Sequence, residues 1–298
     1  MNLRHLEVFR HVMQTGTIKG AAAVLMVSNA AASKLLATAE RRMGLVLFER
    51  AHGRLIPTPE ARRLYEDVEQ LWNRVDRIKA LTHSLAHPKA GTVSIGISPS
   101  FGVKVVPRTT AALLAEMPEL RINVDLMLPY YLLQSVIEGS SDVGVLLNPQ
   151  QHPSLEIIDR FRCGLVCVMP NGHELSARKY VRASDLAGRS VVAFHVLDYG
   201  LTDEMLFGRY SSSILRQVSV HSGLAACWFS DGGAGLAVVD AVAVAGGAFP
   251  NLTIRPYRCE ASLDIFLLRR RGRPLSRPAQ HFCESFRRTW KEMSQRHS

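Results

Sequence analysis

The chain has 298 residues, of which 47% are hydrophobic and 7% aromatic, enough for two or three globular units with separate cores. No run of 18 or more uncharged apolar residues is present and the first residues carry no apolar leader, so the sequence predicts a cytoplasmic protein without a membrane partner. Five cysteines form no C-x-x-C pair, which argues against a metal site and a disulfide scaffold. Buried thiols are expected, with a redox pair between Cys163 and Cys167 as the alternative.

The formal net charge of +10 is unevenly distributed along the chain. Residues 1–90 carry 14 Lys/Arg against 8 Asp/Glu, residues 91–250 carry 11 against 14, and residues 251–298 carry 11 against 4. A basic first segment fits a polyanion such as DNA, because phosphate contacts release counterions, whereas the acidic middle argues against a nucleic-acid groove along the whole chain. The alternative is charge that only maintains solubility.

Apolar residues recur at helical spacing in three stretches of the first 48 residues, which predicts three short helices around one small core. Ser28 is the expected N-cap of the third helix, and the small residues Ala21 and Ala22 allow two helices to cross closely, as in a helix-turn-helix. An Ala-rich bundle with a charged rim is the alternative. If the apolar positions of the third helix face inward, its outward face presents polar side chains to a major groove, and these are Asn29, Ser33, Lys34 and Thr38.

Residues 49–56 predict a hairpin that turns at His52-Gly53, with Arg50 and Arg54 placed to straddle the DNA backbone. Thr58 and Pro59 then start a long helix. Its apolar residues recur at alternate steps of four and three from Leu64 to Leu85, which is typical of a coiled coil and predicts pairing with a second copy. A single long helix packed on its own domain is the alternative.

From Thr92 onward the pattern changes to alternating strands and helices, which predicts a parallel sheet followed by a second lobe. The strand at 263–268 and the helix at 278–293 are expected to return to the first lobe, leaving a cleft between two lobes. The predicted organisation is α/β with an N-terminal all-α unit: winged helix-turn-helix 1–58, linker helix 59–87, hinge 88–91, first lobe 92–162 plus 267–298, and second lobe 163–266.

The N-terminal residues form an ordered pattern, Thr17-x3-Ala21-Ala22-x2-Leu25-x2-Ser28-x4-Ser33-Lys34-x5-Glu40-x3-Gly44-x2-Leu47-Phe48-x-Arg50, followed by Thr58-Pro59. This pattern resembles the signature of LysR-type transcriptional regulators. The resemblance implies a winged helix-turn-helix, dimers joined through the linker helix and often paired into tetramers, and an effector domain similar to periplasmic binding proteins. RNA polymerase is a further expected partner. Asn29-Ala30 stands where the family usually has Gln-Pro, and Ala39 where it has Leu.

Two further segments, residues 9–16 and 235–240, resemble the branch of this family that responds to opines and basic amino acids. In that branch Pro usually follows the position of Asp240, whereas this chain has Ala241. The resemblance therefore implies an amino acid or opine-like effector. Thr17 and Lys19, at the start of the second helix, are further expected DNA contacts.

The effector is expected between the lobes. Ser98, Ser100, Phe101 and Gly102 end a strand and open a helix, so their N–H groups and hydroxyls are placed to cradle a carboxylate. By resemblance, Pro129, Tyr130, Asn148 and His195 form the opposite wall, and Asp231 faces an effector ammonium group. A loop histidine without a ligand and a turn-forming aspartate are the alternatives for His195 and Asp231.

Catalytic motifs are missing from the sequence: there is no G-x-S-x-G, P-loop, H-E-x-x-H or G-x-G-x-x-G after the first strand. We therefore expect no enzyme activity, no metal and no cofactor beyond a small-molecule effector. The expected mechanism is that the effector changes the angle between the lobes and so alters how the dimers sit on DNA. A cytosolic receptor without DNA binding and an α/β enzyme with a helical appendage are the alternatives.

Overall fold

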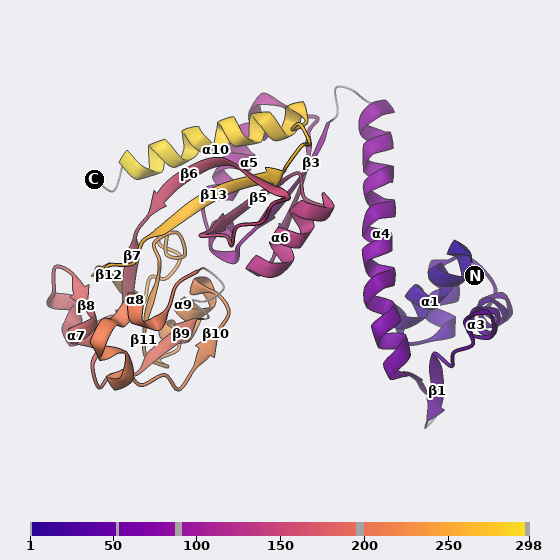
Figure 1. Ribbon diagram of the computed structural model, residues 1–298, viewed down its shortest axis with the longest axis horizontal. Coiled ribbons are helices and arrows are strands. Elements are labelled where there is room, and N and C mark those ends of the chain that lie inside the picture. Colours follow the sequence, from indigo (N-terminus) through magenta and orange to yellow (C-terminus); the bar gives the residue numbers. More distant parts are fainter. Residues whose placement is uncertain (1, 52–53, 87–90, 195–199, 296–298) are drawn as a thin grey trace. The chain divides into compact units, whose positions relative to one another are not determined.

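The computed structural model describes residues 2–51, 54–86, 91–194 and 200–295. The chain divides into two compact units, residues 1–82 and 83–298. Figure 1 shows the helices and strands of both units.

The N-terminal unit begins with three helices, α1 (Leu3–Thr15), α2 (Ile18–Val24) and α3 (Asn29–Met43). Each starts at a polar N-cap that accepts a backbone N–H, as Ser28 does from Ala31 at 3.1 Å. The strands β1 (Phe48–Ala51) and β2 (Arg54–Pro57) then pair antiparallel. The predicted helices and hairpin are therefore confirmed, while the turn at 52–53 lies outside the described residues.

Helix α4 (Pro59–Ala86) starts where predicted, with the Thr58 hydroxyl accepting the N–H of Ala61 at 3.2 Å. Val68 and Trp72 are buried in the core of the N-terminal unit. Farther along the helix, the apolar stripe leaves this core and the Ile78 side chain is 64% exposed. The first part of α4 thus packs on its own unit, whereas the later part of the stripe has an apolar residue in solvent.

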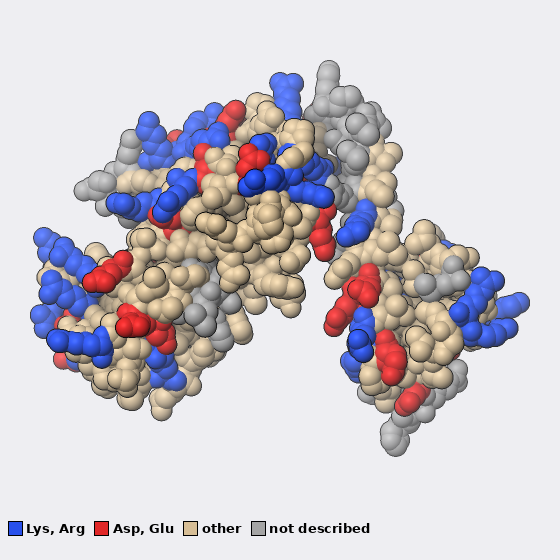
Figure 2. All heavy atoms as spheres, viewed as in Figure 1, with Lys and Arg blue, Asp and Glu red and all other residues tan. Residues whose placement is uncertain are grey.

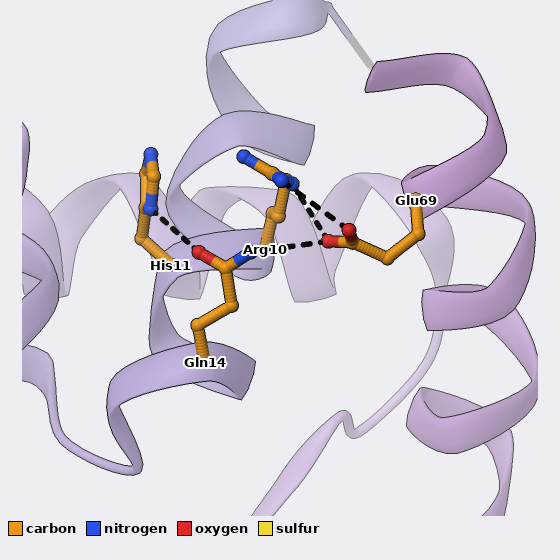
Figure 3. Close-up of polar contacts among 4 residues, drawn as sticks. All are labelled: Arg10, His11, Gln14 and Glu69. Atoms are coloured by element: carbon orange, nitrogen blue, oxygen red, sulfur yellow. Dashed lines mark hydrogen bonds and ion pairs between the residues drawn. The ribbon is translucent and has the colours of Figure 1, made fainter. Parts of the chain in front are cut away.

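A polar cluster fixes α4 against α1 (Figure 3). The Arg10 guanidinium donates to both carboxylate oxygens of Glu69, at 2.6 and 3.2 Å, and Gln14 donates to the same carboxylate at 3.3 Å. His11 in turn bonds the amide oxygen of Gln14 at 3.1 Å, and Arg10 lies over the ring of Trp72. Because the Arg10 and Glu69 side chains are only 17% and 30% exposed, the pair is shielded from solvent screening. The cluster therefore joins the first helix to the linker helix.

The first lobe of the C-terminal unit is a five-stranded sheet of order β4-β3-β5-β13-β6. Helices α5 and α10 pack on one face of it and α6 packs on the other, since Leu147 of β5 belongs to the first core and Leu146 to the α6 core. The elements are β3 (Thr92–Ile97), the short 3-10 helix η1 (Pro99–Gly102), α5 (Val105–Glu116), β4 (Arg121–Leu126), α6 (Pro129–Glu138), β5 (Val143–Leu147), β6 (Leu155–Cys163), β13 (Leu263–Arg270) and α10 (Arg277–Gln295).

The second lobe is a six-stranded sheet of order β10-β9-β11-β7-β12-β8, with α9 packed against β7, β9 and β11. Its elements are β7 (Leu165–Pro170), η2 (Glu174–Ala177), β8 (Val181–Arg182), α7 (Ala183–Leu186), β9 (Val191–Phe194), α8 (Asp203–Phe207), η4 (Gly208–Ser213), β10 (Ser219–Val220), α9 (Gly223–Asp231), β11 (Leu236–Asp240) and β12 (Leu252–Arg258).

The chain crosses between the lobes twice, from β6 to β7 and from β12 to β13 (Figure 1). The structure differs from the sequence-based expectations at three points. The strands β6 and β12 were not predicted, and the first sheet is mixed because β13 runs antiparallel to β5 and β6. The first lobe also resumes at Leu263 rather than at residue 267, because Leu263 already pairs with Cys163 in its sheet.

Among the described residues, no single helix is long and apolar enough to cross a membrane. The pair α2 and α3 meets that test of length and composition only when taken together across a bend of 108°.

We expect Glu69→Gln to lower the free energy of unfolding of the N-terminal unit by about 1–2 kcal/mol, because it leaves a shielded guanidinium without its charged partner. Chemical denaturation followed by circular dichroism measures this loss. Glu7→Gln is the matched control, because Glu7 is as exposed as Glu69 but pairs with Arg4, whose side chain is 46% exposed, and we expect it to cost less than about 0.5 kcal/mol. Equal losses in the two variants would contradict a shielded link between α1 and α4.

Candidate nucleic-acid interface and effector site

The outward face of α3 carries the predicted DNA-contacting residues. Asn29, Ser33 and Lys34 are exposed and Thr38 is half-buried. On the opposite face, the apolar residues Ala32, Leu36 and Ala39 are buried in the core with α1 and α4. Burial of one face therefore leaves the polar face of α3 open, which is the arrangement that a recognition helix requires.

The remaining predicted contacts flank this helix. Thr17 is exposed, but its hydroxyl oxygen caps α2 by accepting the N–H of Gly20 at 3.0 Å. Lys19 is exposed on α2. Arg50 and Arg54 lie on the paired strands β1 and β2, and their side chains are outside the described part of the structure.

The balance of charge differs between two helices of the N-terminal unit. Helix α3 carries Lys34, Arg41 and Arg42 against Glu40, whereas the first turns of α4 carry Arg62 and Arg63 against Glu60, Glu66 and Asp67. In Figure 2, Lys and Arg side chains gather at the α3 end of this unit, whereas acidic and basic side chains lie together toward α4. A negatively charged backbone is thus attracted to the α3 side.

The predicted effector-binding turn forms the short helix η1 at the end of β3. Ser98, Ser100 and Phe101 are all buried, and Gly102 lies against Leu126 of β4. The N–H of Phe101 donates to Ser98 and the N–H of Val103 to Ser100, so these two amides are used within the turn. The Ser98 hydroxyl oxygen is buried and has no hydrogen-bond partner among the described residues. A hydroxyl, more than the two amides, is therefore available to a ligand in this turn.

Asp240 faces η1 from the second lobe, and it was not among the predicted site residues. The Ser100 hydroxyl donates to one Asp240 carboxylate oxygen at 2.9 Å, across 140 residues of sequence, and the N–H of Ala243 donates to the other at 2.9 Å. Gly223, the first residue of α9, lets Asp240 approach this helix, because a Cβ there would lie 2.6 Å from the carboxylate. The two lobes are therefore joined by a hydrogen bond to a buried acid.

Burial raises the pKa of Asp240 to about 6, although the hydrogen bonds from Ser100 and Ala243 oppose this shift. Among the described residues no Lys, Arg or His forms an ion pair with this carboxylate, and it is 2% exposed. A buried carboxylate held only by neutral donors would be stabilised by an additional cation.

The other predicted effector residues lie apart from this contact. Pro129 is buried at the start of α6 and Tyr130 is 68% exposed, with its ring against Tyr131. The Asn148 side chain donates to the Ser262 carbonyl and accepts the N–H of Asp264, so it ties β5 to the start of β13. Asp231 is the last residue of α9 and lies about 12 Å along the helix from Gly223, the residue that lies against Asp240. His195 lies outside the described residues.

Comparison with known proteins decides the family. Residues 3–62 match the bacterial regulatory helix-turn-helix protein, lysR family, and residues 86–291 match the LysR substrate binding domain. The chain belongs to the LysR family of DNA-binding transcription regulators. This confirms the helix-turn-helix, the effector-binding domain and the resemblance on which they were predicted.

Relatives of this regulator align along most of its length. It is 29% identical to the transcriptional activator protein LysR of Escherichia coli over 96% of this chain and 91% of that protein. It is 30% identical to the octopine catabolism/uptake operon regulatory protein OccR of Rhizobium meliloti over 82% and 81%. These relatives are transcription regulators rather than enzymes.

Solved structures share its fold. The crystal structure of CbnR, a LysR family transcriptional regulator, superposes with a TM-score of 0.78 at 19% identity, covering 97% of this chain and 99% of CbnR. Full-length CbnR in complex with its target DNA superposes with a TM-score of 0.75 at 20% identity, covering 97% and 100%.

The cysteines of the regulator are free thiols, and burial raises the pKa of both Cys163 and Cys167 to about 12. A thiol with so high a pKa is a poor nucleophile, so the geometry favours packing over a redox role for this pair. Within the described ranges, no group of three or more His, Cys, Asp or Glu side chains is placed to hold a metal ion.

The raised pKa of Asp240 makes stability depend on pH. The folded chain holds this proton more tightly than the unfolded chain, so ionisation costs stability as the pH rises from about 4 through about 6. Asp240→Asn keeps the shape of the side chain and removes its charge. We compare the free energies of unfolding of this variant and the parent chain. We expect the difference between them, the advantage of Asp240→Asn, to increase by about 1–2 kcal/mol between pH 5 and pH 8.

Urea unfolding at the two pH values, followed by circular dichroism, measures this change. Asp125→Asn, which alters an exposed carboxylate on β4, is the control and should show no such increase. An advantage of Asp240→Asn that is the same at both pH values would show that Asp240 does not ionise in this interval.

Proposed function

We propose that the regulator responds to a small amino acid or an opine-like metabolite that binds between its lobes at η1 and Asp240. The observation that carries this proposal is the buried Asp240 carboxylate, which is held by neutral donors and faces the first lobe. An effector ammonium group at this carboxylate would supply the missing positive charge. We accordingly place the ammonium contact at Asp240 rather than at Asp231.

The turn at η1 suits the other end of such a molecule. The Ser98 hydroxyl is buried without a partner among the described residues and is available to donate to an effector carboxylate. The similarity to OccR, the octopine catabolism/uptake operon regulatory protein, supports an amino-acid-derived effector. Pro129, Tyr130 and His195 remain proposed walls of the same site.

The direct bond between Ser100 and Asp240 suggests how binding is sensed. It joins the two lobes, so a ligand that binds Asp240 would replace this contact between the lobes with a contact through the ligand. The angle between the lobes then differs in the two states, and the effector shifts the equilibrium by its difference in affinity for them. We propose that the protein acts by binding and does not transform its effector.

We also propose that α3 enters the major groove, with Asn29, Ser33 and Thr38 near the bases and Thr17, Lys19, Lys34, Arg50 and Arg54 near phosphates. The later part of α4, with Ile78 exposed, would pair with the α4 of a second copy, and two such dimers would form a tetramer. Contact with RNA polymerase and a cytoplasmic location complete the proposal. The organisation into unit 1–58, linker helix 59–87 and hinge 88–91 remains part of it.

Isothermal titration of the full chain with L-arginine, L-lysine and octopine tests the effector site. We expect at least one of them to bind, and Asp240→Asn to weaken that binding at least tenfold because the ammonium loses its charged partner. Succinate, which lacks an ammonium group, is the control ligand, and Asp240→Asn should not weaken its binding. Loss of binding in Asp231→Asn, with Asp240→Asn unaffected, would move the ammonium contact to the far end of α9.

An electrophoretic shift assay on the intergenic DNA upstream of its own gene tests the DNA contacts. We expect discrete complexes that resist nonspecific competitor. Lys34→Ala should weaken binding about tenfold and reduce the slope of log affinity against log salt concentration by about one. Lys179→Ala, which removes an exposed cation from the second lobe, is the matched control. Equal affinity of the parent and both variants would show that Lys34 does not contact phosphate.

A further inference from the structure

A cavity of about 440 Å³ lies where the chain crosses between the lobes. Its walls include Val166, Val242 and Ile254 from the second lobe and Trp290 and Met293 from the end of α10. Figure 1 shows that end of α10 extending from the first lobe toward the second. The volume lies in the range of small-molecule sites, and the walls are mostly apolar with a single aromatic ring.

One cation, Arg162, lines this cavity at the end of β6. The other charged side chains of β6 are all paired: Glu156 with Arg269, Asp159 with Arg287, and Arg160 with Asp264. Arg162 stands across from Asp264 on β13, but that carboxylate is already bound to Arg160. Among the described residues Arg162 is therefore the one charged side chain of β6 without an ion pair, and it is exposed.

The chemistry of this cavity differs from that of the site at η1. Its lining offers hydrophobic area and one guanidinium, and it contains no acidic side chain that would attract an ammonium group. An arginine binds a carboxylate through two parallel hydrogen bonds, and apolar walls bury the rest of a hydrophobic molecule. A small acid with an aromatic or branched body fits both features.

The cavity also shares a wall with the loop that follows Asp240. Ala241, Val242, Val244 and Ala245 line it, while the N–H of Ala243 in the same loop donates to the Asp240 carboxylate. The N–H of Ala241 donates to Gly164 in the first crossing segment at 2.9 Å. A molecule in the cavity would therefore contact both the crossing segment and the loop that holds Asp240.

The geometry points to a second ligand site in this cavity, which takes a small hydrophobic monocarboxylic acid with its carboxylate on Arg162 and its body against Trp290 and Val242. The site is separate from the proposed site at η1, and its ligand lacks an ammonium group. A regulator with both sites binds two metabolites of different chemistry.

Fluorine NMR titration of the full chain with trifluoromethylbenzoate tests the site, and trifluoromethylbenzamide is the uncharged matched probe. We expect saturable binding of the acid, about tenfold weaker binding of the acid to Arg162→Gln, and an unchanged affinity of the amide for that variant. Ala245→Phe fills the cavity and should abolish binding of both probes. Arg121→Gln and Ala177→Phe place the same changes on exposed surfaces of the two lobes and should alter neither affinity.

Three outcomes would overturn the proposal. These are no saturable binding of the acid, an affinity for the acid that Arg162→Gln leaves unchanged, and binding lost in Ser98→Ala while Ala245→Phe retains it. The last result would place the acid at η1. Thermal unfolding of each variant checks its fold, and Arg162→Gln keeps the test informative even if Ala245→Phe disturbs the loop, because Arg162 is exposed and unpaired among the described residues.

Discussion

The pairing of β6 with β13 is the constraint on which the C-terminal unit depends. These strands lie on either side of the second lobe in the sequence and pair from Cys163 with Leu263 to Leu155 with Arg270. Since β13 also pairs with β5, the first sheet is incomplete until the chain has returned from the second lobe. The second lobe is therefore inserted between two crossing segments, and any change of angle between the lobes must bend those segments.

This constraint places the polar groups of the lobe junction close to the crossing segments. Asp240 pairs with Leu165 immediately after the first crossing, and its carboxylate reaches back to Ser100 in the first lobe. A buried acid is costly to ionise, and that cost is tolerable where ligand binding offsets it. The junction thus combines a contact between lobes with the group that an effector would use, which is what coupling requires.

Much of the fold followed from periodicity. The caps at Ser28 and Thr58 and the apolar faces of α3 and β3 are local signals, and the structure confirms them. The strand β6 escaped prediction because its pattern interleaves charged residues that pair with β13 and α10, a long-range arrangement that periodicity does not report. The contact of Ser100 with Asp240 escaped for the same reason, and Asn148 was assigned to a ligand although its amide ties two strands together.

The order in which the chain completes its parts has a consequence for synthesis. The DNA-binding unit is finished within the first 82 residues, whereas the first lobe must wait for residues 263–270, which form the strand between β5 and β6. During translation the edges of β5 and β6 stay open while the second lobe is made between them, and open strand edges are prone to wrong pairing. A ribosome that stops early therefore releases a complete DNA-binding unit whose sensory partner has no finished first sheet.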